Sequence, residues 1–167
     1  MGDTVDRIVR EVNRRFHLRA RLRLPWALEM IDRDAVMPLL LEACPSFAEP
    51  WAAYRSTEPD VAGLLYLDLG ELARHLVELL KQRKTSELGA VFAAVERLHL
   101  EGDALVKEAA TIGLLEGIQN CAASAGVDPD DFVVYLLPES RTWWDELERF
   151  WAGRSPYVGA AVEDRDD

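Results

Sequence analysis

The stretch that decides the fold is LYLDLGELARHLVELLKQRK, residues 65–84. Its leucines recur at helical spacing and make one apolar stripe, formed by Leu65, Leu69, Leu72, Leu76, Leu79 and Leu80. Cations follow at Lys81, Arg83 and Lys84, where the dipole of a helix favours positive charge near its carboxyl end. The stretch therefore predicts one long amphipathic helix that ends near Lys84.

The segments that follow predict four more helices. A helix that starts at Thr85 or Ser86 is expected to end at Gly102 in a left-handed cap. We expect Asp103 to cap a third helix that closes at Gly126. Asp128-Pro129 then marks a further helix start, because proline is tolerated at the first helical position. Pro138 opens a last helix, closed by Gly153.

The segments before residue 65 predict shorter helices. Asp34 can cap a helix that holds Pro38 in its first turn, and Pro45 stops that helix. Ser46 can then cap a short helix that reaches Tyr54. The chain is thus predicted to be all-α, a single domain of about seven or eight helices. Short loops favour antiparallel helical hairpins, and two arrangements stay open: a HEAT-like stack and an irregular bundle.

The net charge of the chain is −11, but the charged residues are unevenly distributed. Three parts of the chain differ in charge. Residues 1–24 hold seven arginines against three acidic residues, and we interpret them as a basic helix followed by an extended arm. The helix is indicated by a stripe of Val5, Ile8, Val9, Val12 and Phe16. Residues 25–153 form the acidic helical domain, and residues 154–167 a flexible acidic tail. The negative body disfavours nucleic acid and favours a basic protein partner.

The chain shows no secretory signal and no apolar run long enough for a membrane helix, so we expect no membrane partner. Its two cysteines, Cys44 and Cys121, lie far apart and in no CxxC spacing. We expect both to be reduced, as small hydrophobes in the cytoplasm.

The sequence offers little that points to catalysis, and we predict a non-enzymatic protein with no cofactor. It contains no Gly-x-Ser-x-Gly elbow, and Gly113 and Gly117 are spaced for the close approach of another helix rather than for a phosphate loop. Glu96 and His99 have the Glu-x-x-His spacing of di-iron bundles, whereas the second candidate pair, Glu71 and His75, has the wrong spacing. We expect no metal, and a metal-dependent enzyme stays as the weaker alternative.

Two groups of residues are candidate contacts for a partner protein. Glu116, Gln119 and Asn120 interrupt an apolar run, with Glu116 and Asn120 on one helix face. Trp143, Trp144 and Trp151 exceed what one buried stripe requires, and tryptophan is enriched at interface hot spots. The alternative for the polar group is hydrogen bonding to a neighbouring loop or to water, and for the tryptophans it is core packing.

Residues 69–151 resemble an uncharacterised family of small helical bacterial proteins. The likeness rests on Leu76-Val77-Glu78, on Glu101-Gly102-Asp103 with Val106, on Ile112–Glu116 and on Leu137–Ser140, with MPLLLEACPSFA at residues 37–48 also similar. The resemblance implies no established activity and no catalytic residues; it suggests helical domains that act as immunity proteins. We therefore expect a protein-binding domain that neutralises a basic toxin. The rival hypothesis is a helical scaffold or adaptor.

Overall fold

The computed structural model describes residues 30–57 and 64–154, and their regular structure is helical. The elements are α2 (Arg33–Ala43), η1 (Pro45–Phe47), α3 (Ala48–Thr57), α4 (Leu65–Lys81), α5 (Leu88–Glu101), α6 (Ala104–Glu108), η2 (Ala109–Leu115), α7 (Glu116–Ala125), η3 (Pro129–Tyr135) and α8 (Pro138–Trp151). The prediction of a single all-α domain is confirmed. The predicted basic helix, the extended arm and nearly all of the predicted tail lie outside the described residues.

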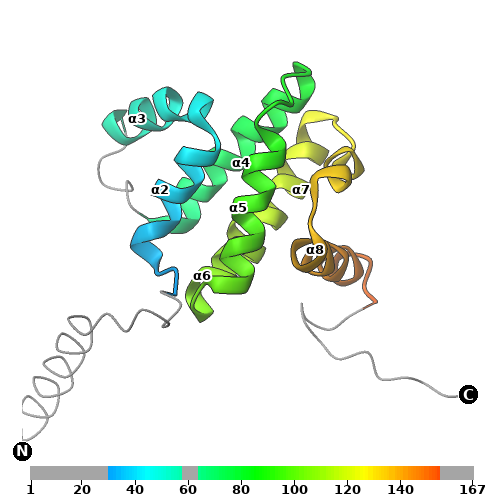
Figure 1. Ribbon diagram of the computed structural model, residues 1–167. Helices are drawn as coiled ribbons and strands as arrows, with labels where there is room; N and C mark the ends of the chain where they lie inside the picture. Colours follow the sequence, from blue (N-terminus) through cyan, green and yellow to red (C-terminus); the bar gives the residue numbers. More distant parts are fainter. Residues whose placement is uncertain (1–29, 58–63, 155–167) are drawn as a thin grey trace, which may run out of the picture.

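Helices α4 and α5 and the continuous segment α6–η2–α7 form the centre of the molecule. Helices α2 and α3 lie on one side of them and α8 on the other (Figure 1). Both α2 and α8 pack mainly against α5. Among the described residues, no helix is both long enough and apolar enough to cross a bilayer.

The apolar stripe of α4 is the spine of the core, as its spacing predicts. Leu69, Leu72 and Leu76 are fully buried, while Leu80 at the end of the stripe is half-buried. Complete burial of a leucine contributes about 1.5–3 kcal/mol, which is why this stripe fixes the orientation of α4. The helix ends at Lys81, three residues before the predicted end.

Small residues allow α4 and the segment η2–α7 to approach closely. A methyl group added at Gly113 would lie 2.9 Å from Cδ1 of Leu69, and one added at Gly117 would lie 3.4 Å from Cβ of Ala73. These contacts advance together along both helices, so α4 and α7 run parallel. The interpretation of the two glycines as points of helix approach is confirmed.

The packing order is that of an irregular bundle rather than of stacked hairpins. In a stack of hairpins, each helix packs most closely against its neighbour in sequence. Here α4 makes its most extensive contacts with η2 and α7, although α5 follows it after a short turn. The sequence does not predict which helices pack against one another, because loop length alone does not determine the packing partners.

The two helix starts predicted before residue 65 are wrong, and α5 begins at Leu88 rather than at Thr85 or Ser86. Asp32, not Asp34, caps α2: its carboxylate accepts hydrogen bonds from the backbone N–H groups of Asp34 and Ala35, both at 3.1 Å. Pro38 consequently lies in the second turn of the helix. Ser46 lies within η1 rather than at its cap.

Gly102 ends α5 but does not adopt the predicted left-handed conformation, since its φ is −72° and its ψ is 155°. Glycine is required there for space. A Cβ atom at this position would lie 2.3 Å from the Leu98 carbonyl oxygen and 2.5 Å from Cγ1 of Val106. Gly102 also pairs with Ile31 in a parallel bridge, which ties the start of the described chain to the end of α5. The left-handed glycine caps are Gly126 and Gly153, each with φ of 68°.

Candidate functional site

Trp144 belongs to the core and not to a docking surface, which corrects the prediction made from its sequence. Its side chain is fully buried, and its indole N–H donates to Glu148 at 3.0 Å. Leu147, one turn further along, is also fully buried. The buried stripe of α8 therefore runs through Trp144, and its neighbour Trp143 is turned to one side.

The other two tryptophans differ in exposure. Trp143 is half-buried, stacks on the ring of His99 at 6.3 Å between centroids, and donates its indole N–H to Glu139 at 3.1 Å. Trp151 is 58% exposed and meets Phe150 edge to face. Of the three predicted contact residues, Trp151 is the one whose ring lies mostly open to solvent.

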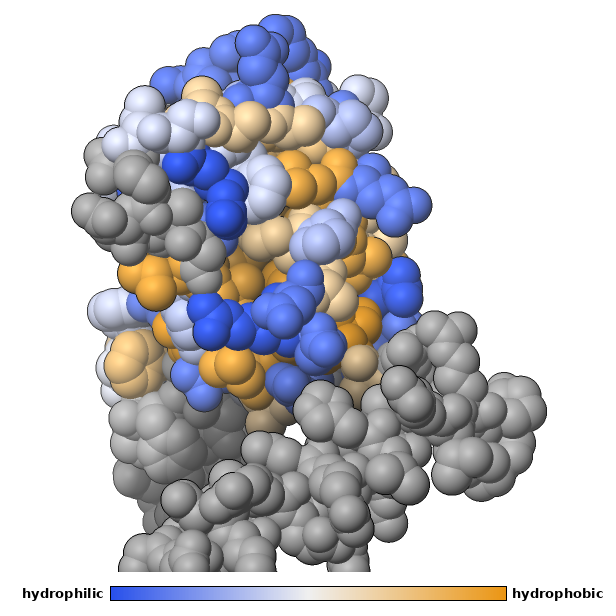
Figure 2. Space-filling model, turned by 90° about the vertical axis from the view of Figure 1, so that its left-hand side faces the viewer, coloured by the Kyte–Doolittle hydropathy of each residue, from blue (hydrophilic) through white to orange (hydrophobic). Residues whose placement is uncertain are grey.

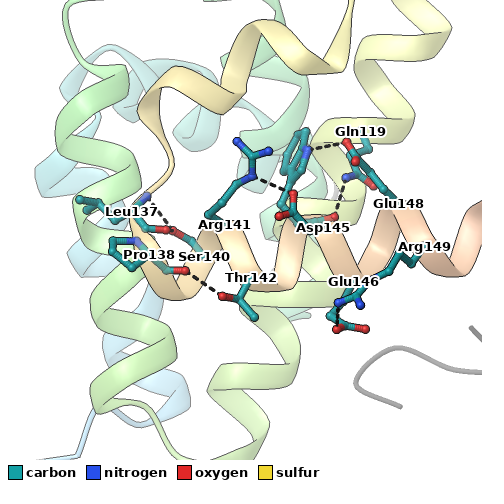
Figure 3. A network of polar contacts seen from close by, with 11 residues as sticks. Gln119, Leu137, Pro138, Ser140, Arg141, Thr142, Asp145, Glu146, Glu148 and Arg149 are labelled. Carbon is teal, nitrogen blue, oxygen red and sulfur yellow. Dashed lines mark hydrogen bonds and ion pairs between the residues drawn. The ribbon is translucent and has the colours of Figure 1, made fainter. Parts of the chain in front are cut away.

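Gln119 connects α7 to α8 and is only 8% exposed. Its amide N–H donates to the backbone carbonyl of Trp144 at 3.4 Å, in the polar network around α8 (Figure 3). The prediction that Gln119 forms part of an open surface is therefore wrong, and its alternative, a hydrogen bond to a neighbouring element, is what the structure shows. The outer side of α8 carries the ion pairs Arg141–Asp145, at 2.7 Å, and Arg149–Glu146.

Glu116 and Asn120 lie on a different side of α7, where Asn120 is exposed and Glu116 half-buried. Ile112 precedes Glu116 by four residues and is also exposed, so the three side chains follow one side of the helical segment. This side lies next to the outer side of α4, because α4 packs along η2 and α7. We call the combined surface the α4–α7 face. It consists of Tyr66, Leu67, Gly70, Glu71, Arg74 and Glu78 together with Leu105, Glu108, Ile112, Glu116, Asn120 and Cys121.

Two shallow grooves hollow the α4–α7 face. One, of about 420 Å³, lies between α4 and α7 and is lined by Arg74, Val77, Glu78, Asn120, Cys121, Ser124 and Ala125. The other, of about 560 Å³, lies toward α3 and is lined by Tyr54, Thr57, Tyr66, Leu67, Gly70, Glu71 and Arg74. Arg74 borders both, so the grooves adjoin. Their floors contain glycine, alanine and serine, which leave space for the side chains of a ligand.

One end of the α4–α7 face is apolar. Tyr66, Leu67, Leu105 and Ile112 are each between 38% and 47% exposed. The phenol of Tyr66 donates to Glu108 at 2.7 Å and so joins the start of α4 to α6. Burial and this hydrogen bond raise the pKa of Tyr66 to about 12, and the phenol therefore stays protonated as a donor.

The polar part of the face is predominantly acidic. Glu71, Glu78, Glu108 and Glu116 supply four carboxylates. Arg74 is the one cation among the residues that define the face and is paired with Glu71, while Glu78 is paired with Lys81 one turn further along α4. Apolar side chains bordered by carboxylates suit a ligand that is itself apolar in part and positively charged.

A further hollow lies on the side of the molecule that carries α2 and α3. Figure 2 shows apolar side chains in the middle of this side, among hydrophilic groups. Arg55 lies 4.9 Å from the centre of the Trp51 ring and 3.9 Å from the carboxylate of Asp68. The hollow, of about 350 Å³, is also lined by Arg33 and Asp34, so its charges balance. The hollow therefore favours neither a cationic nor an anionic ligand.

Glu96 joins α5 to α8. Its carboxylate accepts hydrogen bonds from the backbone N–H groups of Glu139 and Ser140, both at 2.8 Å, and from the Ser140 hydroxyl at 2.7 Å. Burial acts to raise the pKa of Glu96, but these hydrogen bonds outweigh it and the pKa is lowered. Glu96 thus caps the amino end of α8 from another helix, where a negative charge also favours the helix dipole.

His99, the second half of the Glu-x-x-His pair, is buried and bonded to Thr111 at 3.1 Å. The Thr111 hydroxyl also lies 3.1 Å from the Lys107 carbonyl oxygen, one turn earlier in the chain. Burial lowers the pKa of His99. Both members of the pair are engaged in packing helices together. In the described ranges, no group of three or more His, Cys, Asp or Glu side chains is arranged to hold a metal ion.

A second polar cluster was missed by sequence reasoning. Ser46 donates its hydroxyl proton to Glu87 at 2.6 Å and accepts from Nε2 of His75 at 2.9 Å. The buried thiol of Cys44 donates to the same carboxylate at 3.2 Å, and burial raises the pKa of Cys44 to about 11. His75 therefore cannot accept the serine proton, and Cys44 stays a thiol. The cluster holds η1 to α4 and α5; its members are too far apart in sequence for spacing to reveal it.

The comparisons with known proteins identify a family and no activity. A family described as Domain of unknown function (DUF7674) matches residues 37–152, and the chain belongs to this family. No curated protein and no solved structure matches the chain.

Proposed function

We propose that this member of the DUF7674 family is a non-enzymatic protein-binding domain whose partner is basic and docks on the α4–α7 face. The proposal rests on one observation: exposed apolar side chains, two adjoining grooves and four carboxylates lie on one surface. Protein interfaces combine an apolar centre with a polar rim, and opposite charge speeds the encounter. The more specific role that we propose is the neutralisation of a basic toxin in the cytoplasm of a bacterial cell.

The polar clusters support a binding role over a catalytic one. Glu96 is saturated by three hydrogen bonds from the start of α8, and Ser46 donates its proton to Glu87. The same oxygen of Glu87 also accepts from the backbone N–H of Ser46 and from the Cys44 thiol, so this carboxylate serves as a structural acceptor at the start of η1. These groups stabilise helix contacts, whereas the α4–α7 face keeps apolar side chains such as Ile112 partly exposed to solvent.

The proposal is tested with the full-length protein as bait in its source cell. Wild-type protein is expected to retain one basic protein through washing, and Ile112→Asp and Glu116→Lys are expected to lose it. Glu49→Lys, an exposed position on α3 with the same charge change, serves as the matched control and should retain it. Retention of the same partner by Ile112→Asp and Glu116→Lys would refute the assignment of the face.

The purified partner then separates toxin neutralisation from a scaffold role. If the protein neutralises a toxin, expression of the partner alone arrests growth and co-expression of the wild-type chain restores it. The Ile112→Asp variant should fail to restore growth while being produced at the wild-type level. A partner that is harmless when expressed alone would favour the adaptor hypothesis.

A further inference from the structure

The start of the described chain lies against one end of the α4–α7 face. The backbone N–H of Ile31 donates to the Glu101 carbonyl at 3.0 Å, and the N–H of Asp103 donates to the Ile31 carbonyl at 3.1 Å. Met30, which is 66% exposed, therefore leaves the body beside the first residues of α6. Leu105, at the apolar end of the face, lies two residues beyond Asp103. Whatever precedes Met30 begins next to this surface.

The sequence that precedes Met30 complements the face, because it contains an apolar stripe and a positive charge, whereas the face is acidic. The stripe of Val5, Ile8, Val9, Val12 and Phe16 predicts an amphipathic helix over residues 4–16. A helix of about this length is only marginally stable alone in water, so its apolar side requires a surface to pack on. Residues 1–24 hold seven arginines against three acidic residues, whereas the face is acidic.

The length of chain available is sufficient for the segment to reach the face. Residues 17–29 can span up to about 45 Å when extended. The face extends along the helical segment from Leu105 to Asn120, which is about 22 Å at the rise of an α-helix. Every part of the face therefore lies within reach.

We propose that residues 4–16 of the same chain dock on the apolar end of the α4–α7 face and compete there with the partner. This inference rests on the proposed function, because it assigns one surface to two ligands. Docking places the valine and isoleucine stripe against Leu67, Leu105 and Ile112. The partner must displace the segment, so its apparent affinity is reduced by the fraction of molecules in which the face is covered.

Paramagnetic broadening in the full-length protein tests the contact directly. A nitroxide is attached at Asp6→Cys in a Cys121→Ser background, in which the remaining Cys44 is buried and its thiol pKa of about 11 keeps it unreactive. The methyl resonances of Leu67, Leu105 and Ile112 should lose most of their intensity, and Val9→Asp with Val12→Asp should restore it. Reduction of the nitroxide in the same sample is the control and should make these methyl resonances sharp again.

Two outcomes would overturn the proposal. One is a label at position 6 that broadens no methyl on the face, or that still broadens them after the double aspartate substitution. The other is broadening that occurs only between a spin-labelled molecule and an isotope-labelled one and disappears on dilution, which would assign the face to a second copy.

Failure of the inference is distinguishable from failure of the proposed function. If the segment docks, Val9→Asp with Val12→Asp should tighten binding of the partner, by about tenfold where the segment covers the face nine-tenths of the time. An undocked segment together with partner binding that depends on Ile112 would overturn only the inference. A docked segment together with partner binding that ignores Ile112 would overturn only the proposed function.

Discussion

Helix α7 presents one side to α8 and another to the groove beside α4, and the two sides are covered to different degrees. Gln119 faces α8 and is almost fully buried, while Asn120, the next residue, is exposed beside the groove. Both are uncharged amides in one polar run of sequence. Their difference shows that a polar residue in an apolar helix can serve either a contact between helices or an open surface, and that the packing of neighbouring helices decides which.

The largest effect is expected on the covered side. Trp144→Ala removes a fully buried indole and leaves a cavity between α8 and the core, so it should lower the free energy of unfolding by about 3–5 kcal/mol. Denaturant titration followed by circular dichroism measures the loss. A change below about 1 kcal/mol would mean that α8 contributes little to the fold.

The cap that Glu96 provides to α8 is the next test. Glu96→Ala leaves two partly buried backbone N–H groups without their acceptor and leaves the Ser140 hydroxyl only the Leu137 carbonyl, which should cost about 2 kcal/mol. Glu96→Gln keeps the shape and one acceptor oxygen, so it should cost less in the same titration. Equal losses for the two variants would show that the charge and the second acceptor are unimportant.

Substitution of Gly113 and Gly117 tests the close packing of the segment η2–α7 on α4, which forms the base of the α4–α7 face. Gly113→Ala places a methyl group 2.9 Å from Leu69, and the crowding should outweigh the gain in helix propensity and destabilise the protein by about 1 kcal/mol. Gly117→Ala meets only an ordinary contact and should be neutral or stabilising. Thermal unfolding of both variants checks the order; a more stable Gly113→Ala would contradict the close approach.

Acid should weaken the contact between α5 and η2 through His99. Burial lowers the pKa of His99, although the Val95 carbonyl and the carboxylates of Glu139 and Glu96 oppose this and Lys107 assists it. As the pH falls below about 6.5, the unfolded chain binds a proton that the folded chain binds less readily, and stability decreases until the folded pKa is reached.

The matching measurement is the free energy of unfolding between pH 7 and pH 5 for wild type and His99→Gln. The free energy of unfolding should decrease less in the variant than in wild type. Part of the decrease that remains in the variant comes from His75, whose pKa is also lowered by burial. The lowered pKa values of Glu96 and Glu87 act in a separate range, where stability is lost as the pH falls below about 4.5. An identical slope for both proteins would show that His99 titrates normally.

Most of the fold could be predicted from the sequence because local patterns determine it. The leucine spacing of α4, the aspartate cap of α6 and the glycines at positions 126 and 153 each act within a few residues. The order of packing could not be predicted, because it depends on contacts such as that of Glu96 with Ser140, 44 residues apart. No local pattern encodes a cap that is supplied by another helix.

The candidate site was predictable in part for the same reason. Asn120 is exposed and Glu116 half-buried, as the break in the apolar run suggests, whereas Gln119 is bonded to α8 and Trp144 lies in the core. The apolar end of the face was missed. Leu105 and Ile112 precede Glu116 at helical spacing, which could have linked them to it, but leucine and isoleucine in a helix are normally assigned to the core.

The central claim is that the open side of α7 binds a basic partner, and the most direct test is isothermal titration of the purified partner with wild type and Ile112→Asp. Ile112 is 38% exposed, so the substitution removes part of its apolar burial and adds a carboxylate four residues from Glu108 and Glu116; it should lower the free energy of unfolding by about 1–2 kcal/mol, and circular dichroism must show that the variant is folded. We predict that it nevertheless weakens binding at least tenfold, and that wild-type binding weakens as salt is raised. Unchanged affinity in a folded Ile112→Asp variant would contradict the account.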